Sequence, residues 1–192
     1  MVVYVKENIA DMGEEDYLLA RSLVSDQRRS LSDRYKRRTD RIGSVMAYRA
    51  LQEGLKKEYD IDGAPEFGYE ESGKPFLQDR RDIYFNLSHC DKAAGCVISD
   101  RAAGIDIEEI KPLDDEVMDY ALSEDEKRRV IESDDPEVEF AKIWTRKESM
   151  VKLDFSYWRG DLKSILEREN EVIFHTEVHR EKGYVVSVAE MR

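Results

Sequence analysis

The sequence is poor in cysteine and has no long apolar run, and each absence excludes a class of protein. Its 192 residues include two cysteines, Cys90 and Cys96, too few for a disulfide framework and typical of a reducing, cytoplasmic setting. No stretch approaches the ~20 apolar residues that span a bilayer. The opening residues, MVVYVKENIADMGEED, lack the pattern of a signal peptide. We therefore expect no association with a membrane.

Acidic residues outnumber basic ones, 43 Asp and Glu to 31 Lys and Arg. The net charge of −12 argues against nonspecific nucleic-acid binding, because contacts to phosphates need clustered cations. One segment, DQRRSLSDRYKRRTDR at 26–41, is strongly basic all the same. It is either a solvated helix surface or a local site for an anionic ligand such as a small polyphosphate. With 41% hydrophobic and 39% charged residues, the chain is typical of a soluble globular protein.

The order of expected elements occurs twice along the chain. Each half begins with a β-rich run, MVVYVKENI or GIDIEEI, continues into a long helical pattern at 36–58 or 137–153, and ends in a predicted hairpin. The two hairpins are expected to turn near Lys92–Gly95 and Glu181–Gly183. This repeat predicts an α+β fold of two similar halves meeting across a seam, residues 1–100 and 101–192.

The run GIDIEEI carries two carboxylates within apolar surroundings. In an extended segment Asp106 and Glu108 point to the same face. Two close carboxylates repel each other unless a cation or a proton lies between them. Mg²⁺ meets that need, since it takes one or two carboxylates together with substrate phosphate oxygens. The alternative is a solvent-facing edge strand.

A helical segment further along supplies a third carboxylate. In FAKIWTRKESMVK, helical spacing places Glu148 one turn from both Trp144 and Lys152. We expect Trp144 to anchor the helix in the core, with Glu148 at the rim of the packed face. The alternative is an ordinary Glu–Lys pair on the surface.

A further group of polar residues suits a phosphate. Lys74 lies between Gly73 and Pro75 in an expected turn, while Ser88 and His89 end a predicted strand. Such groups hold a phosphate by ion pairing and hydrogen bonding. A hydrolase triad is disfavoured because no acidic partner is placed nearby.

Taken together, GKP, FNLSH, GIDIEEIKPL, LSEDE and WTRKES closely resemble the motif series of the 4′-phosphopantetheinyl transferases. The resemblance is to the longer, pseudo-dimeric type that activates peptide-synthetase and related carrier proteins. It covers residues 73–152, with weaker similarity at 28–49. It implies two similar α+β halves in a pseudo-twofold arrangement and a monomer, because the seam is already made within one chain.

The resemblance implies a Mg²⁺-dependent reaction. The 4′-phosphopantetheine group would pass from coenzyme A to a serine hydroxyl of an acyl or peptidyl carrier protein, releasing adenosine 3′,5′-bisphosphate. The N-terminal half would contact the coenzyme A nucleotide, and the C-terminal half would carry the metal-binding and catalytic motifs. The implied metal ligands are Asp106, Glu108 and Glu148.

The same motifs imply further roles. Lys152 would neutralise the pyrophosphate and assist the leaving group, while Glu148, a metal-bound water or Glu126 would remove the serine proton. Contacts to the nucleotide and its phosphates fall to Lys74, Ser88, His89, Arg28 and Arg41.

The chain departs from the family pattern after this helix. The family usually carries a Gly-Lys-Gly-Leu-like loop there, whereas this chain reads LDFSYWRGDL, with Tyr157 and Trp158 where glycine is expected. The aromatic pair is either core packing or part of an apolar surface that docks the carrier. Two other functions stay open: a metal-dependent phosphodiesterase or nuclease built on the same carboxylates, and a non-catalytic coenzyme A-binding homologue.

Overall fold

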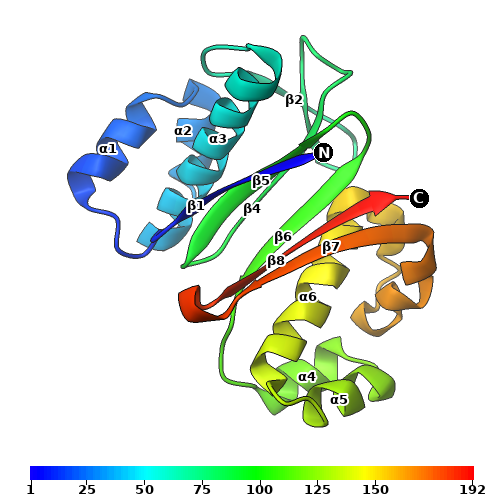
Figure 1. The fold of residues 1–192 in the computed structure, drawn as a ribbon. Coiled ribbons are helices and arrows are strands. Elements are labelled where there is room, and N and C mark those ends of the chain that lie inside the picture. Colours follow the sequence, from blue (N-terminus) through cyan, green and yellow to red (C-terminus); the bar gives the residue numbers. More distant parts are fainter. The chain divides into compact units, whose positions relative to one another are not determined.

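The fold is described from a computed structural model that covers all 192 residues. The chain divides into two compact units, Met1–Ala103 and Gly104–Arg192. Each unit contains both helices and a sheet, which confirms the predicted α+β class (Figure 1). The break between the units lies just after the boundary near residue 100 that the sequence suggested.

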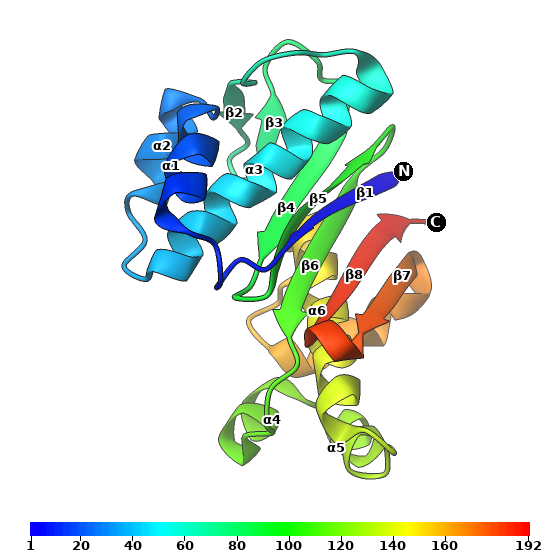
Figure 2. The same cartoon turned by 60° about the vertical axis from the view of Figure 1, so that its left-hand side comes forward.

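The N-terminal unit is a three-stranded sheet covered on one face by helices. Its strands and helices are β1 (Val2–Glu7), α1 (Glu14–Ser22), α2 (Asp26–Ser32), α3 (Arg38–Tyr59), β4 (Tyr84–His89) and β5 (Ala93–Ser99). The strands are antiparallel in the order β1-β5-β4. Helix α3 lies across this sheet, and α1 and α2 pack on α3 (Figure 2). A separate two-stranded sheet consists of β2 (Phe67–Tyr69) and β3 (Pro75–Leu77).

Helix α3 closely matches the predicted helix at 36–58. Apolar residues at helical spacing, including Ile42, Val45 and Leu55, are fully buried against the sheet. The helix ends because Asp60 adopts a left-handed conformation with φ of 54°. The Ile61 amide then donates to the Leu55 carbonyl at 3.2 Å, which satisfies one of the last helical carbonyls.

The first hairpin turns earlier than the sequence suggested. Strand β4 ends at His89 and β5 begins at Ala93, so the expected turn at Lys92–Gly95 is wrong. Gly95 lies inside β5, where it pairs with Ser88 on one side and Val5 on the other. The small residues after Lys92 therefore belong to the centre of the sheet, where both neighbouring strands lie close.

The C-terminal unit repeats the order strand, long helix, hairpin. Its elements are β6 (Ala103–Glu109), α4 (Asp115–Ala121), α5 (Glu124–Ile131), α6 (Pro136–Leu153), β7 (Val172–His179) and β8 (Tyr184–Met191), with short 3₁₀ helices at Phe155–Tyr157, Leu162–Glu171 and Arg180–Lys182. Its strand order is β6-β8-β7, so both sheets place the first strand beside the second strand of the hairpin. None of the helices combines the length and apolar character needed to cross a membrane.

Strand β6 lies unusually close to helix α6 at Gly104. A Cβ atom built on Gly104 would lie 2.1 Å from the Ser149 carbonyl oxygen and 2.3 Å from the Leu153 amide nitrogen. Both neighbours are helix backbone, which cannot move aside as a flexible side chain does. Only glycine allows this approach, and the approach brings the following residues of β6 against the last turns of α6.

We predict that Gly104→Ala lowers the free energy of unfolding by about 1–3 kcal/mol, the usual cost of overpacking a core. Thermal and urea unfolding would measure the loss. Gly13→Ala is the control, because a Cβ there meets nothing closer than 3.5 Å; it should change stability by less than about 1 kcal/mol. Equal effects of the two changes would show that the approach of β6 to α6 is not tight.

Candidate active site

The central feature of the C-terminal unit is an ion pair between β6 and α6. Asp106 is 2% exposed, and its Oδ1 accepts a hydrogen bond from Lys152 Nζ at 2.5 Å. Burial alone would lower the pKa of Lys152, but the neighbouring carboxylates, Asp106 foremost, raise it above its usual value. Lys152 is therefore a firmly charged ammonium whose partner is a buried carboxylate.

Two more carboxylates belong to the same electrostatic cluster. Burial, and then repulsion from Asp106, raise the pKa of Glu108 to about 7, although Lys152 and a hydrogen bond from Trp144 oppose the shift. The pKa of Glu148 is raised by the same two causes in the same order. Asp106, Glu108, Glu148 and Lys152, which the sequence selected, thus lie close enough to set one another's charge.

The donor chemistry of this cluster fits Mg²⁺, which prefers carboxylate oxygens. Three carboxylates and one ammonium leave negative charge in excess, and repulsion from Asp106 adds to burial in raising the pKa of Glu108. As the side chains lie, no group of three His, Cys, Asp or Glu residues is arranged to hold a metal ion. The assignment of Asp106, Glu108 and Glu148 as metal ligands therefore stays a prediction.

Trp144 occupies a different place from the one expected. It is half-buried rather than anchored in the core, and its ring stacks on Phe140 with centroids 6.1 Å apart. Together with Glu108 and Val117, these rings line a cavity of about 370 Å³. The expectation of a core anchor is wrong because the core-facing side of α6 is taken by other residues, including Ile143 and Met150.

A second lysine of α6 is buried, and its ammonium group is enclosed by hydrogen-bond acceptors. Lys147 is 1% exposed, and its Nζ donates to Glu126 Oε2 at 2.6 Å and to the carbonyl oxygens of Ala121 and Leu162. Glu126 also accepts from the Ser123 amide, closing the cap of α5. Glu126 is therefore engaged in holding α5 against α6, and this geometry does not favour it as the base that takes a serine proton.

Sequence reasoning missed the role of Lys147. Its signal was available in LSEDE, where Ser123 and Glu126 have the spacing of a capping box. A capping glutamate held inward leaves a buried negative charge, and a buried charge requires a partner.

In the N-terminal unit, His89 packs on the first half of α3. A Cβ on Gly43 would lie 2.7 Å from the His89 ring, so glycine makes room for the imidazole. The Tyr35 ring meets His89 edge-on, with centroids 5.8 Å apart. Ser88 precedes His89 at the end of β4 and is 6% exposed. Neither Tyr35 nor Gly43 was selected from the sequence.

The two predicted arginines, Arg28 on α2 and Arg41 on α3, both lie beside the first half of α3 but in different surroundings. Arg28 is 8% exposed; it sits over the rings of Tyr48 and Phe67 and donates to Ser44 Oγ at 3.2 Å. Desolvation lowers its pKa from the usual high value. Arg41 is more accessible and donates to the carbonyl oxygens of residues 35 and 36, which holds the turn that carries the Tyr35 ring.

Lys74 is placed apart from this group. It lines a cavity of about 270 Å³ with Tyr84 and Phe85, the first residues of β4, whereas Ser88 and His89 end that strand. Its Nζ reaches the Ala103 carbonyl at 3.5 Å. The structure therefore gathers His89, Arg28 and Arg41 beside the first half of α3. The Ser88 side chain points to the face of β4 opposite His89, and Lys74 lies toward the other end of that strand.

The departure after α6 is partly explained by packing. Tyr157 is 3% exposed, and the Arg168 guanidinium lies 4.5 Å from its ring centroid. Trp158 is half-buried, and Gly160 then adopts φ of 83°. Tyr157 is thus a core residue, as one of the two interpretations held.

Comparison with known proteins shows which family the C-terminal unit matches. Residues 102–189 match the family described as the 4′-phosphopantetheinyl transferase superfamily, and they cover nearly all of the C-terminal unit. The match contains all the carboxylates of the cluster and Lys152. Residues 102–189 belong to this superfamily.

Curated relatives extend the similarity into the N-terminal unit. A 4′-phosphopantetheinyl transferase of Bacillus subtilis is 29% identical over 143 residues, or 73% of this chain and 63% of its own length. The 4′-phosphopantetheinyl transferase Sfp of B. subtilis strain 168 is 26% identical over 78% of this chain and 67% of its own length. The psf-1 transferase of Bacillus pumilus is 32% identical over 68% of this chain and 57% of its own length. The chain thus spans about three fifths of the length of these relatives.

We predict that removing the Glu108 charge stabilises the protein at alkaline pH. In the unfolded chain Glu108 ionises near the usual glutamate pKa of 4.5, whereas in the folded chain its pKa is about 7. The folded state therefore loses stability as pH rises from about 4.5 to about 7, and the loss persists above that range. Glu108→Gln, which cannot ionise, should unfold at a higher temperature than the wild type at pH 8, and the two should converge at pH 4.5.

Thermal unfolding in metal-free buffer at several pH values measures this difference. Glu169→Gln is the control, since Glu169 is an exposed residue of the 3₁₀ segment Leu162–Glu171. A difference between wild type and Glu108→Gln that did not change with pH would contradict the raised pKa.

Proposed function

We propose that this protein transfers 4′-phosphopantetheine from coenzyme A to a serine hydroxyl of an acyl or peptidyl carrier protein, with Mg²⁺ as cofactor. The observation that carries the proposal is the cluster of three carboxylates around Lys152, which lies inside the segment that matches the transferase superfamily. Curated relatives named as 4′-phosphopantetheinyl transferases support the same activity.

In this proposal the metal is held by Asp106, Glu108 and Glu148. When bound, Mg²⁺ would neutralise the coenzyme A pyrophosphate and the charge that develops on it. A cation also answers the electrostatic need of the cluster, since Glu108 holds a proton up to about pH 7 without one. Metal binding should accordingly strengthen as pH rises through that value.

The side chains of α6 have separate tasks in the transfer. The serine oxygen attacks the pantetheine-side phosphorus, and the bond from that phosphorus to the bridging oxygen breaks, releasing adenosine 3′,5′-bisphosphate. Lys152 carries positive charge beside the site and offsets the charge on the leaving phosphate. Glu148 has a raised pKa, so it is a suitable acceptor for the serine proton. Because Glu126 is committed to Lys147, we give it no part in this step.

The nucleotide end of coenzyme A is assigned to the N-terminal unit. His89 and Arg41 would contact the nucleotide and its phosphates near the start of α3. Ser88 would contact it at the end of β4, and Lys74 nearer the start of that strand. Arg28 is buried under Tyr48 and Phe67, so we assign it to supporting Ser44 and the helix start rather than to an exposed phosphate contact. The shared element order of the two units supports a pseudo-twofold arrangement, which forms part of the same proposal.

The proposal predicts a metal-dependent binding step that needs Asp106. Calorimetric titration of coenzyme A should give tight binding with Mg²⁺, and affinity should fall by about tenfold or more with chelator or in Asp106→Asn, which loses one charge-assisted contact. Intact mass of an apo carrier protein should rise by one phosphopantetheine group only with the wild type and Mg²⁺. Asp125→Asn, an exposed change on α5, is the matched control.

The possible results separate the competing functions. Absence of coenzyme A binding under every condition would overturn the proposal. Binding indifferent to metal and to Asp106→Asn would indicate a non-catalytic coenzyme A-binding protein instead.

We further predict that His89→Ala weakens binding of coenzyme A more than binding of dephospho-coenzyme A. The two ligands differ only in the 3′-phosphate, so the comparison isolates the contact to that group from any loss of fold. Titrating both ligands into His89→Ala and into His179→Ala, a control at a half-buried histidine of the other unit, measures the difference. Equal losses for both ligands in His89→Ala would refute the 3′-phosphate role.

A further inference from the structure

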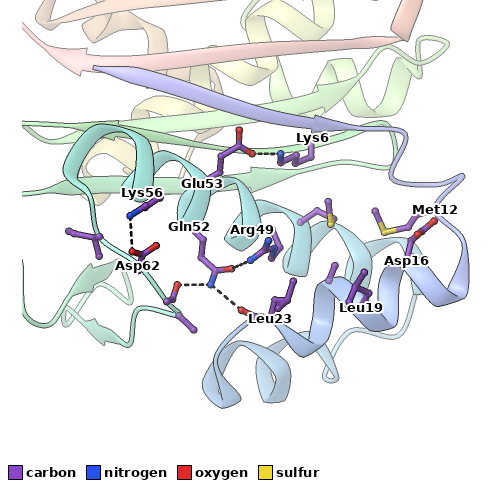
Figure 3. Close-up of a pocket in the computed structure, with 15 residues that line it drawn as sticks. Lys6, Met12, Asp16, Leu19, Leu23, Arg49, Gln52, Glu53, Lys56 and Asp62 are labelled. Carbon is purple, nitrogen blue, oxygen red and sulfur yellow. Dashed lines mark hydrogen bonds and ion pairs between the residues drawn. The ribbon is translucent and has the colours of Figure 1, made fainter.

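A large pocket lies on the N-terminal unit, lined by none of the residues assigned above. Its volume is about 650 Å³, and it is bounded by α1, α3, the end of β1 and the loop that follows α3 (Figure 3). That volume falls within the usual range of small-molecule sites. One wall is apolar and is made by Met12, Leu19, Ala20, Leu23, Met46 and Ile61.

The charged side chains of the pocket are mostly paired with one another. Lys6 pairs with Glu53, and Lys56 pairs with Asp62 at 2.7 Å (Figure 3). Hydrogen bonds from Lys57 and Lys6 lower the pKa of Glu53 to about 2, so this carboxylate stays ionised at neutral pH. These pairs leave no net charge for a ligand to neutralise.

Asp16 and Arg49 are the exceptions: Asp16 is an exposed residue in the first turn of α1, beside Met12 (Figure 3), and Arg49 is the one cation of the pocket without an acidic partner. It is half-buried on α3, and its guanidinium donates only to the neutral amide oxygen of Gln52, at 2.8 Å. Gln52 in turn donates to the carbonyl oxygens of Leu23 and Gly63, which fixes both sides of the pocket around Arg49 (Figure 3). A guanidinium has five donors in a planar fork that matches a carboxylate, so most of this recognition capacity is unused.

We propose that this pocket binds a monocarboxylate with an aliphatic chain, whose carboxylate pairs with Arg49 and whose chain lies along the apolar wall. A single negative charge matches the single cation that lacks an acidic partner. A phosphate dianion suits the pocket less well, because three carboxylates, Asp16, Glu53 and Asp62, also line it. The chain would cover Leu19 and Leu23, which are 63% and 47% exposed.

Decanoate is the probe, and methionine methyl groups report where it binds. Two of the six methionines, Met12 and Met46, line the pocket. With ¹³C-methyl methionine, decanoate should shift the Met12 and Met46 signals in a saturable way and leave those of Met118, Met150 and Met191 unchanged. Absence of saturable shifts, or shifts spread over all methionines, would overturn the proposal.

The charge requirement is tested by substitution and by a neutral ligand. Arg49→Gln should weaken decanoate binding by about 10-fold to 100-fold, the loss of a charge-assisted contact, and Arg49→Lys should restore part of it. Arg159→Gln, an exposed arginine of the other unit, should leave affinity unchanged. Decanol should bind the wild type and Arg49→Gln equally; equal affinity of the wild type for decanol and decanoate would refute the role of Arg49.

A second variant distinguishes loss of ligand binding from loss of the folded state. Leu19→Asp places a negative charge on the apolar wall at a position that is 63% exposed, so the core is not disturbed. It should weaken decanoate at least tenfold while the thermal unfolding temperature stays unchanged. Unchanged affinity in Leu19→Asp would place the ligand elsewhere. Coenzyme A binding, measured in the same samples, reports the proposed transferase site independently.

Discussion

A buried carboxylate on β6 sets the conditions for the rest of the C-terminal unit. Asp106 is 2% exposed, and a charge so placed is costly unless a cation lies in contact with it. Lys152 supplies that cation, and it reaches Asp106 because Gly104 lets the strand approach the backbone of α6. Burial, and then repulsion from the same negative charge, raise the pKa of Glu108 and Glu148. One close approach of a strand to a helix thus creates both the ion pair and the demand for a further cation.

Two lysines of α6 show how the same side chain takes different roles through its surroundings. Lys147 is enclosed by one carboxylate and two carbonyl oxygens, so each of its three N–H bonds has a fixed partner. Desolvation lowers its pKa, which suits a structural group that never meets solvent. Lys152 is 29% exposed at its side chain and keeps its charge beside several carboxylates. It therefore combines a structural contact with access to a ligand.

The sequence predicted the elements better than the contacts. Helix α3 and the second hairpin were located from periodicity and turn residues, because these signals are local. Strand parity placed Asp106 and Glu108 on one face, whereas the resemblance to the transferase family was what joined Glu148 to them. The enclosure of Lys147 and the half-exposed setting of Trp144 depend on which face of α6 each neighbour covers, and single-sequence periodicity does not contain that information. Arg28 looked like an exposed phosphate contact for the same reason, since the rings that cover it lie 20 and 39 residues further along the chain.

In each unit an ion pair between a lysine and a carboxylate joins the first strand to the long helix. The strand carries the carboxylate in one unit and the lysine in the other. In the C-terminal unit the strand contributes the glycine and the carboxylate, Gly104 and Asp106, and the helix contributes the lysine. In the N-terminal unit the helix contributes them, as Gly54 and Glu53, and the strand contributes Lys6. The space beside Gly54 is filled by the Ile98 side chain of β5 and the Tyr4 ring of β1, and the Lys6–Glu53 pair remains about one-third exposed. Water screens that pair, so it places no demand for a further cation on its neighbours. The two units share a topology, but only the C-terminal unit has a candidate metal site, because its carboxylate lies on the strand and is buried.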